Sequence, residues 1–231
     1  MKHRCCIAMV CLLAISALPA QDQNQPPNPA IPTVTFELFW EQATPQSYTI
    51  TVDGMGAAHY VSRNPTRASA PITAPTYDPE YDTLFTMSGK SRERIFELAR
   101  ELDYFHGDFD YRQHKIANTG TKTLRYADAV RNFSTSYNWS ENKSIQELTN
   151  LFQGISNTLQ YGQRLQFKKR FDKLGLEAEL KTMEAQAQNK ELAELQVIAP
   201  VLQNIADDTS VLHIARERAK RLLAQAGQAK D

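Results

Sequence analysis

The spacing of apolar residues changes near the middle of the chain, and this change constrains the fold more than any other feature. Up to about residue 139, apolar and polar side chains alternate in several short runs, which is typical of half-buried strands. After Ser144 the apolar residues recur every three or four positions, as they do in amphipathic helices. The sequence therefore predicts a strand-rich first part and an all-helical second part.

The first part is expected to form an antiparallel sheet with a helix inserted between strands. Apolar residues at helical spacing predict that helix from Ser91 to about Tyr104, with Ser91 as its N-cap. The runs that alternate as strands do are TVTFELFW (33–40), SYTITV (47–52), AAHYVSR (57–63), DTLFTM (82–87) and those within residues 114–139.

A second helix completes this part. From Ser144 to about Tyr161 the chain has a continuous apolar stripe, and Ser144 with Glu147 has the spacing of a capping box. Strands with two helices on one face define an α+β layer architecture. We therefore predict a small antiparallel sheet packed by two helices over residues 33–161.

Residues 162–231 are predicted to be a separate helical region. Pro200 either kinks the middle helix or stands at the first turn of a new one. Residues 198–223 resemble a single HEAT-type helix pair, but an array needs about three such pairs to bury its apolar faces. We therefore prefer a helical hairpin or short bundle that docks on the α+β domain or on a partner, and residues 176–231 are the predicted partner-binding region.

The N-terminus has the layout of a secretory signal peptide. Lys2 and Arg4 form a basic head, and about a dozen apolar residues ending in small side chains follow. This run is shorter than the roughly 20 residues of a membrane span. The sequence predicts a signal peptide over residues 1–20, with an uncleaved anchor as the alternative, and export to the periplasm or the extracellular space.

Cleavage would also remove every cysteine. Cys5, Cys6 and Cys11 all lie within the predicted signal peptide, so the mature chain would have no disulfide, thiolate metal site or cysteine nucleophile. Residues 21–32 are polar and rich in proline, and we expect them to form a disordered tether.

The charge balance argues against a nucleic-acid partner. The chain has 26 Lys and Arg against 26 Asp and Glu, and loss of Lys2 and Arg4 leaves 24 against 26. A chain so close to neutrality has no global field that would attract nucleic acid. No apolar run after the signal peptide is long enough to span a bilayer.

Four segments of the first part carry a family pattern: YTITVDG (48–54), SRERIFELARELDYF (91–105), TGTKTLRYAD (119–128) and SIQELTNLFQGISNTL (144–159). On these segments, residues 34–160 resemble an uncharacterised family of exported bacterial α+β domains of unknown function. The resemblance implies a fold but no activity, cofactor or site residue. The chain departs from the family at DGMGAAHY, where the usual turn is a bare DG, and in the longer Pro/Ala-rich loop that follows.

Two segments look like sites. SGKS (88–91) lies between a predicted strand and a helix, but a P-loop needs a glycine where Leu84 stands, so a helix N-cap explains it better. FHGDFDYRQH (105–114) offers residue types that bind metals, although they do not have the helical spacing of a zinc motif. We predict no metal and no cofactor; the metal candidates of the alternative interpretation are His106, Asp108, Asp110 and His114.

The stretch SYTITVDGMGAAHY (47–60) leaves the register of a hairpin open. A two-residue or four-residue turn at Asp53 would put His59 on the apolar face, whereas a three-residue loop would turn Tyr60 inward and His59 outward. Gly56 suggests a bulge that sets the register. In each case the stretch is a hairpin turn, and we predict no chemistry there.

The predicted function is that of an exported, non-catalytic interaction or structural module of the bacterial envelope. The alternative is an envelope hydrolase or metal-dependent enzyme that uses the His106–His114 segment. No nucleophile elbow stands in the sequence, and the histidines have no recognisable companion motif, so the non-catalytic interpretation is preferred.

Overall fold

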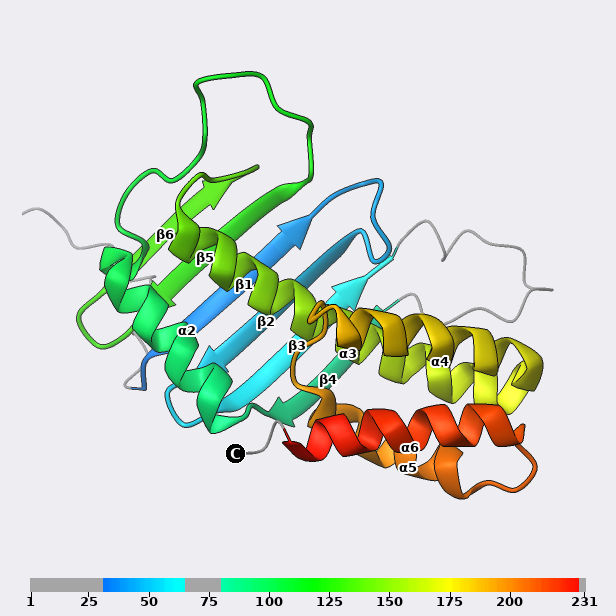
Figure 1. The fold of residues 1–231 in the computed structure, drawn as a ribbon. Coiled ribbons are helices and arrows are strands. Elements are labelled where there is room, and N and C mark those ends of the chain that lie inside the picture. The colour runs from blue at the N-terminus through cyan, green and yellow to red at the C-terminus, as the bar shows by residue number, and fades with distance from the viewer. Residues whose placement is uncertain (1–30, 65–79, 229–231) are drawn as a thin grey trace, which may run out of the picture.

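The computed structural model describes residues 31–64 and 80–228 (Figure 1). The predicted signal peptide and all but residues 31 and 32 of the predicted tether lie outside these ranges. In chain order the elements are β1 (Thr33–Phe39), β2 (Ser47–Asp53), β3 (Ala57–Arg63), β4 (Glu80–Thr86), α2 (Gly89–Glu101), η1 (Asp103–Phe105), β5 (Thr121–Ala127), β6 (Asn132–Tyr137), α3 (Lys143–Phe171), α4 (Lys173–Gln188), η2 (Leu195–Ile198), α5 (Ala199–Asp207) and α6 (His213–Gln228).

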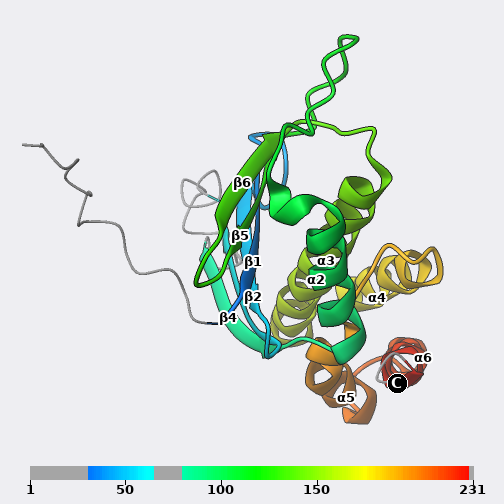
Figure 2. The same cartoon turned by 90° about the vertical axis from the view of Figure 1, so that its left-hand side faces the viewer.

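The strands form one six-stranded antiparallel sheet in the order β4-β3-β2-β1-β5-β6. The predicted α+β class is confirmed, although the sheet is larger than the small sheet expected. Helices α2 and α3 lie across one face, and Figure 2 shows no described helix on the other. This arrangement follows from the alternation of the strands, because one face of an antiparallel sheet can stay in water.

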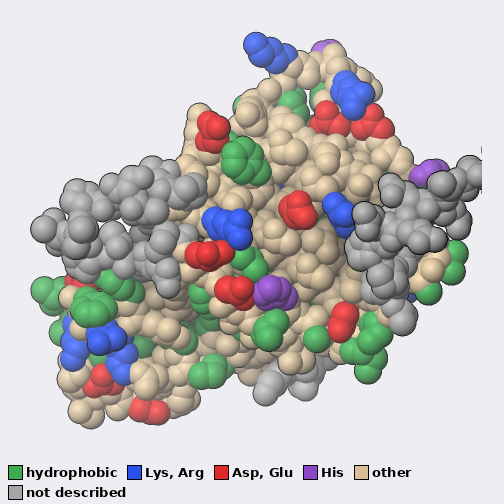
Figure 3. Space-filling model, turned by 180° about the vertical axis from the view of Figure 1, so that it is seen from behind, with side chains coloured by type: hydrophobic (Ala, Val, Ile, Leu, Met, Phe, Trp, Pro, Cys, Tyr) green, Lys and Arg blue, Asp and Glu red, His purple; other side chains and the backbone are tan. Residues whose placement is uncertain are grey.

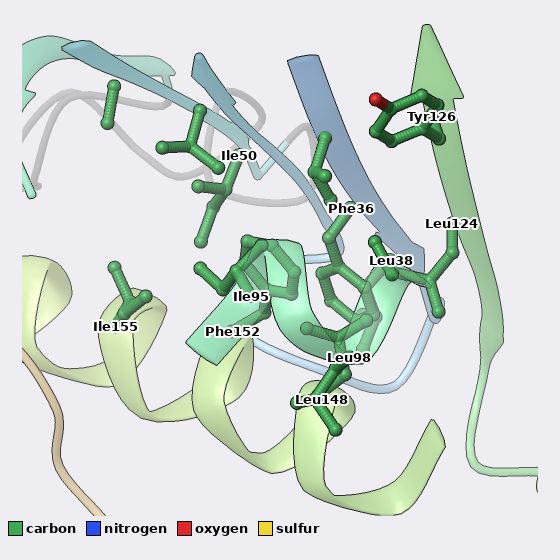
Figure 4. Close-up of a cluster of buried hydrophobic side chains, with 14 of the residues drawn as sticks. Phe36, Leu38, Ile50, Ile95, Leu98, Leu124, Tyr126, Leu148, Phe152 and Ile155 are labelled. Atoms are coloured by element: carbon green, nitrogen blue, oxygen red, sulfur yellow. The ribbon is translucent and has the colours of Figure 1, made fainter. Parts of the chain in front are cut away.

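The covered face carries the main apolar core (Figure 4). Phe36 of β1 stacks on Phe152 of α3 with ring centroids 5.1 Å apart, and Ile95 and Leu98 of α2 pack beside them without exposure to solvent. Burial of each such side chain contributes roughly 1.5–3 kcal/mol relative to its exposure. The predicted apolar stripes of both helices therefore face the sheet.

The uncovered face is mainly polar, with some exposed apolar side chains such as Leu84, and several of its charged side chains form pairs (Figure 3). Hydroxyl side chains meet across neighbouring strands, as between Thr35 and Thr51, whose Oγ1 atoms are 3.1 Å apart. At one side of the face His59 Nε2 lies 2.7 Å from Asp82 Oδ1. Next to this pair, Arg63 is paired with Glu80 at 3.0 Å. Such a surface is compatible with water and needs no cover.

The loop of the β2–β3 hairpin has three residues, which is one of the loop lengths that the sequence left open. Val52 is paired with Ala58, which leaves Gly54, Met55 and Gly56 as the loop. Tyr60 therefore points into the core and His59 out to solvent. Gly56 has φ +93°, a conformation that other residues rarely adopt, and this explains the second glycine of the motif.

The predicted capping residues, Ser91 and Ser144, are both wrong, although the SGKS segment does cap α2 as predicted. Helix α2 is capped by Ser88, whose side chain accepts the N–H of Ser91, and α3 is capped by Asn142. The side chains of the expected capping box bind α2 instead, because Glu147 accepts two bonds from Arg94, at 2.6 and 2.7 Å, and the hydroxyl of Ser144 donates to a glutamate of α2. These contacts hold the two helices together above the sheet.

A left-handed turn ends α2 three residues before the predicted end at Tyr104. Asp103, Tyr104 and Phe105 have φ values of 47°, 57° and 69°. Non-glycine residues pay roughly 1–3 kcal/mol each for such conformations. Complete burial of Phe105 and the packing of Tyr104 between Tyr126 and the guanidinium of Arg131 offset this cost.

Helix α3 continues ten residues past its predicted end and joins two apolar clusters. The sheet cluster ends on it at Leu159, and the second cluster begins on it at Tyr161. The predicted boundary between residues 161 and 162 therefore falls inside a continuous helix. Gly162 permits close approach of η2, since an added Cβ would lie 2.6 Å from Ile198 Cγ2.

The C-terminal region is a helical bundle that docks on α3, as one of the two predicted alternatives requires. Helix α5 restarts with Pro200 in its first turn. No described helix is both long and apolar enough to cross a membrane. The apolar stripes of α4, α5 and α6, together with Val211 just before α6, are buried against one another and against α3; their members are Leu176, Leu180, Met183, Leu202, Ala206, Ala215, Ala219, Leu222 and Ala226.

Glu194 connects the C-terminal helical region to the sheet domain by hydrogen bonds. Its carboxylate is buried at the N-terminus of α2 and accepts the N–H of Ser88 at 2.7 Å and the hydroxyls of Ser88 and Ser91 at 2.6 Å. Gln196 supplies a further N–H. A helix N-terminus attracts anions, so the SGKS segment does bind a negative group, and that group is a side chain of the same protein.

Candidate functional site: the Trp139 pocket

The four predicted metal candidates lie in a loop between η1 and β5. His106 packs against Phe133 and lies 3.4 Å from Asp103, while His114 neighbours Tyr111. The carboxylates of Asp108 and Asp110 bind main-chain N–H groups, and both lie near the guanidinium of Arg112, at 2.9 and 3.7 Å. These acidic side chains therefore organise the loop itself.

The loop brings no metal-binding group together. Within residues 31–64 and 80–228, no three His, Cys, Asp or Glu side chains are close enough to hold a metal ion. His59 is on the uncovered face of the sheet, where it meets Asp82, and does not approach the loop candidates. Nothing in these placements favours the metal-dependent alternative over the non-catalytic one.

The loop instead holds one wall of a pocket. The Asp110 carboxylate accepts the N–H of Asn138 at 2.9 Å, and the N–H of Tyr111 donates to the carbonyl of Trp139 at 2.9 Å. The ring of Tyr111 meets the indole edge-to-face with centroids 5.1 Å apart. Beside this wall lies a cavity of about 570 Å³ between the start of β5, the end of β6 and the first half of α3, which we call the Trp139 pocket.

Lys122 is a buried part of the pocket lining. It lies on the covered face of β5, where the alternation of the strand directs it inward, and only 5% of the residue is exposed. Its Nζ donates to the main-chain oxygens of Thr119, Gly120 and Asn138 and to the hydroxyl of Thr119, at 2.8–3.1 Å. Burial lowers the pKa of Lys122. Since four oxygens already surround the ammonium, it is a structural support for the pocket wall.

Amide side chains line the α3 side. Gln146, Asn150 and Gln153 are spaced i, i+4 and i+7, so they share one face of the helix. Gln146 donates to the carbonyl of Ser140 at 2.8 Å. Asn150 and Gln153 make no hydrogen bond within the described part of the chain, which leaves their donors and acceptors available to a ligand.

The pocket thus combines an aromatic face with neutral polar groups. Trp139 is 41% exposed although its carbonyl accepts a hydrogen bond from Tyr111 and its ring packs against the Tyr111 ring. The hydroxyls of Tyr137 and Thr149 bind each other at 2.6 Å, and burial raises the pKa of Tyr137 to about 12. The full lining is Thr119, Lys122, Tyr137, Asn138, Trp139, Ser140, Ile145, Gln146, Thr149, Asn150 and Gln153. Such a lining can bind and orient a neutral ligand.

Comparisons with known proteins add no relative: no family model matches the chain, and no curated protein matches its sequence. The resemblance of residues 34–160 to exported α+β domains therefore stays a prediction.

None of the pocket residues was predicted as a site. A signal was present in part, because Lys122 occupies an inward position of an alternating strand, beside Leu124 and Tyr126. The amide row borders the apolar stripe of α3 at the same helical spacing. The part that Trp139 plays has no signal in the sequence, since it depends on how the 106–120 loop meets the end of β6.

Proposed function

We propose that this protein is an exported, non-catalytic binding module of the bacterial envelope whose ligand enters the Trp139 pocket. The observation that supports this most strongly is the chemistry of the lining, which pairs an exposed indole with amides and hydroxyls. Ligand pockets are typically apolar or aromatic hollows of about 300–1,000 Å³ with a few polar groups that orient the ligand. The volume of about 570 Å³ lies within that range.

The described residues that line the pocket include no His, Asp or Glu that could act as a general acid or base. General acid–base chemistry needs a group that exchanges protons near neutral pH, and such a group is usually one of these three types. The Lys122 ammonium is surrounded by oxygens, and the Tyr137 hydroxyl is bonded to Thr149. Export rests on the basic and apolar N-terminus of the sequence.

A protein partner of residues 176–231 remains a second element of the proposal. The apolar stripes of this region are buried, so a partner would meet other side chains. Two apolar side chains of the region, Leu212 and Ile214, are about half exposed near the start of α6, and Phe171 and Leu174 are exposed at the α3–α4 junction.

A pelleting assay tests the binding function. The mature protein is incubated separately with purified peptidoglycan sacculi and with envelope membranes, and each mixture is centrifuged. We expect the protein in the pellet of one fraction, no release of soluble fragments, and retention of Trp139→Ala in the supernatant. Circular dichroism of the variant checks its fold.

Two results would contradict the proposal. Equal pelleting of Trp139→Ala would place binding outside the pocket. Release of soluble sugar or peptide fragments by the wild type would favour the hydrolase alternative instead.

A further inference from the structure

We infer that the Trp139 pocket binds a neutral saccharide. This inference rests on the proposed binding function and names the class of ligand for the same pocket. It is supported by three independent features of the lining: the indole, the row of amides and the absence of an unsatisfied charge.

The indole is held as a platform. Edge-to-face packing on Tyr111 and the main-chain bond from Tyr111 to Trp139 fix its position, yet 41% of the residue is exposed. A pyranose ring has an apolar face of C–H groups, which packs favourably against an aromatic face. A fixed, exposed indole therefore recognises a sugar ring without loss of side-chain freedom on binding.

The amides match the hydroxyl groups of a sugar. Each primary amide presents an acceptor oxygen and two N–H donors, and a sugar hydroxyl both donates and accepts. Asn150 and Gln153 are separated by one helical turn and make no bond within the described residues, so both can bind hydroxyls of one ligand. Gln146, the first of the three amides, already donates a hydrogen bond to the carbonyl of Ser140.

The charge of the pocket selects a neutral ligand. Among the described lining residues, Lys122 is the one basic or acidic side chain, and its ammonium already has four oxygen partners at 2.8–3.1 Å. A carboxylate or phosphate would have to displace these oxygens from a buried position. A neutral ring carries no such cost.

Tryptophan fluorescence tests the inference directly. The chain has two tryptophans, so Trp40→Phe leaves Trp139 as the only one. In this background we expect a saturable change in emission with cellotetraose, a glucose oligomer, or with chitotetraose, an N-acetylglucosamine oligomer. The two probes distinguish a plain hexose from an N-acetylated sugar, and calorimetry on the wild type checks that the Trp40 substitution has not altered binding.

Matched variants on α3 locate the binding. Asn150→Ala with Gln153→Ala should weaken binding at least about tenfold, since each lost hydrogen bond lowers affinity several-fold. Asn157→Ala, an exposed asparagine one turn beyond the pocket, should leave binding unchanged. All three substitutions are on the helix surface, and thermal unfolding checks that the fold is retained.

Two outcomes overturn the inference. The first is that neither saccharide, at millimolar concentration, changes the tryptophan emission or gives a binding heat. The second is that binding persists in the double variant of Asn150 and Gln153. Pelleting with envelope membranes that depends on Trp139 would then leave the binding function intact and refute only the saccharide.

Discussion

Glu184 and Glu194 are two buried carboxylates whose surroundings differ. Each residue is 7% exposed. In the bundle, Glu184 of α4 binds the guanidinium groups of Arg218 and Arg221 on α6. At the junction with the sheet domain, Glu194 binds hydroxyl, amide and main-chain donors and no cation within the described residues.

The difference shows two ways to compensate the loss of hydration. An ion pair replaces water by opposite charge, so removal of either partner leaves an uncompensated charge behind. Neutral donors replace water by dipoles, and removal of the carboxylate leaves only neutral groups without partners. The bundle should therefore be more sensitive to loss of its carboxylate than the junction.

Glu184→Ala gives the largest expected effect. Arg221 loses its counter-ion and Arg218 keeps only Glu177, and breaking a buried pair typically costs about 3–5 kcal/mol of the free energy of unfolding. Urea denaturation measures the change. Glu217→Ala is the control, because this glutamate pairs with Lys220 on the exposed side of α6. A loss at Glu184 no greater than at Glu217 would contradict the prediction.

Acid should act on the same carboxylate. The hydrogen bonds from Arg221 and then Arg218 lower the pKa of Glu184 below its ordinary value of 4.5. A carboxyl group with a lowered folded-state pKa stabilises the fold above its unfolded-state pKa, and this contribution is lost as pH falls through the folded-state value. We expect Glu184→Gln to flatten the fall in stability below pH 4.5, measured by urea unfolding at several pH values. An unchanged slope would refute the assignment.

Glu194→Ala should cost less, about 2–3 kcal/mol, because the donors left behind are neutral. Glu194→Gln should recover part of this loss, since the amide oxygen still accepts hydrogen bonds and the serine hydroxyls can rotate to accept from its N–H. Thermal unfolding of both variants measures the difference, with exposed Glu191→Ala as the control. If Gln and Ala cost the same, the acceptor oxygen is not the group that stabilises the junction.

Lys122 is a buried cation that binds neutral oxygens, as Glu194 is a buried anion that binds neutral donors, and Lys122→Met tests its contribution to stability. The stem of the side chain is kept while three main-chain oxygens lose their donor, for which we expect a loss of about 1.5–3 kcal/mol. Exposed Lys190→Met is the control. A neutral result in urea unfolding would mean that water replaces the ammonium without cost.

Local patterns predicted the strands and helices, but not the contacts between them. Residues Ser47–Asp53 and Ala57–Arg63 alternate clearly, so the hairpin was predictable. Its register was not, since loops of two, three or four residues all fit DGMG. The three-residue loop is stabilised by the Asp53 carboxylate, which accepts the N–H groups of Met55 and Ala57, both at 2.9 Å.

The helix caps and the pocket show the same limit. Asn142 and Ser144 are both good capping residues two positions apart, and the choice is made by α2, which binds the side chains of Ser144 and Glu147. Trp139 becomes part of a pocket only where Tyr111 packs on it from a loop far away in sequence. Sequence periodicity carries no information about such contacts.

Asp82 gives the smallest expected effect and completes the comparison of the acidic residues. Its side chain is 61% exposed and pairs with His59 at 2.7 Å on the uncovered face of the sheet, where water hydrates both partners. Exposed pairs contribute roughly 0.2–1 kcal/mol, so Asp82→Ala should change the urea midpoint less than any substitution at Glu184 or Glu194. The order Glu184, Glu194, Asp82 follows if desolvation sets the cost. A loss at Asp82 equal to that at Glu194 would show that strand pairing at β4, and not burial of charge, determines it.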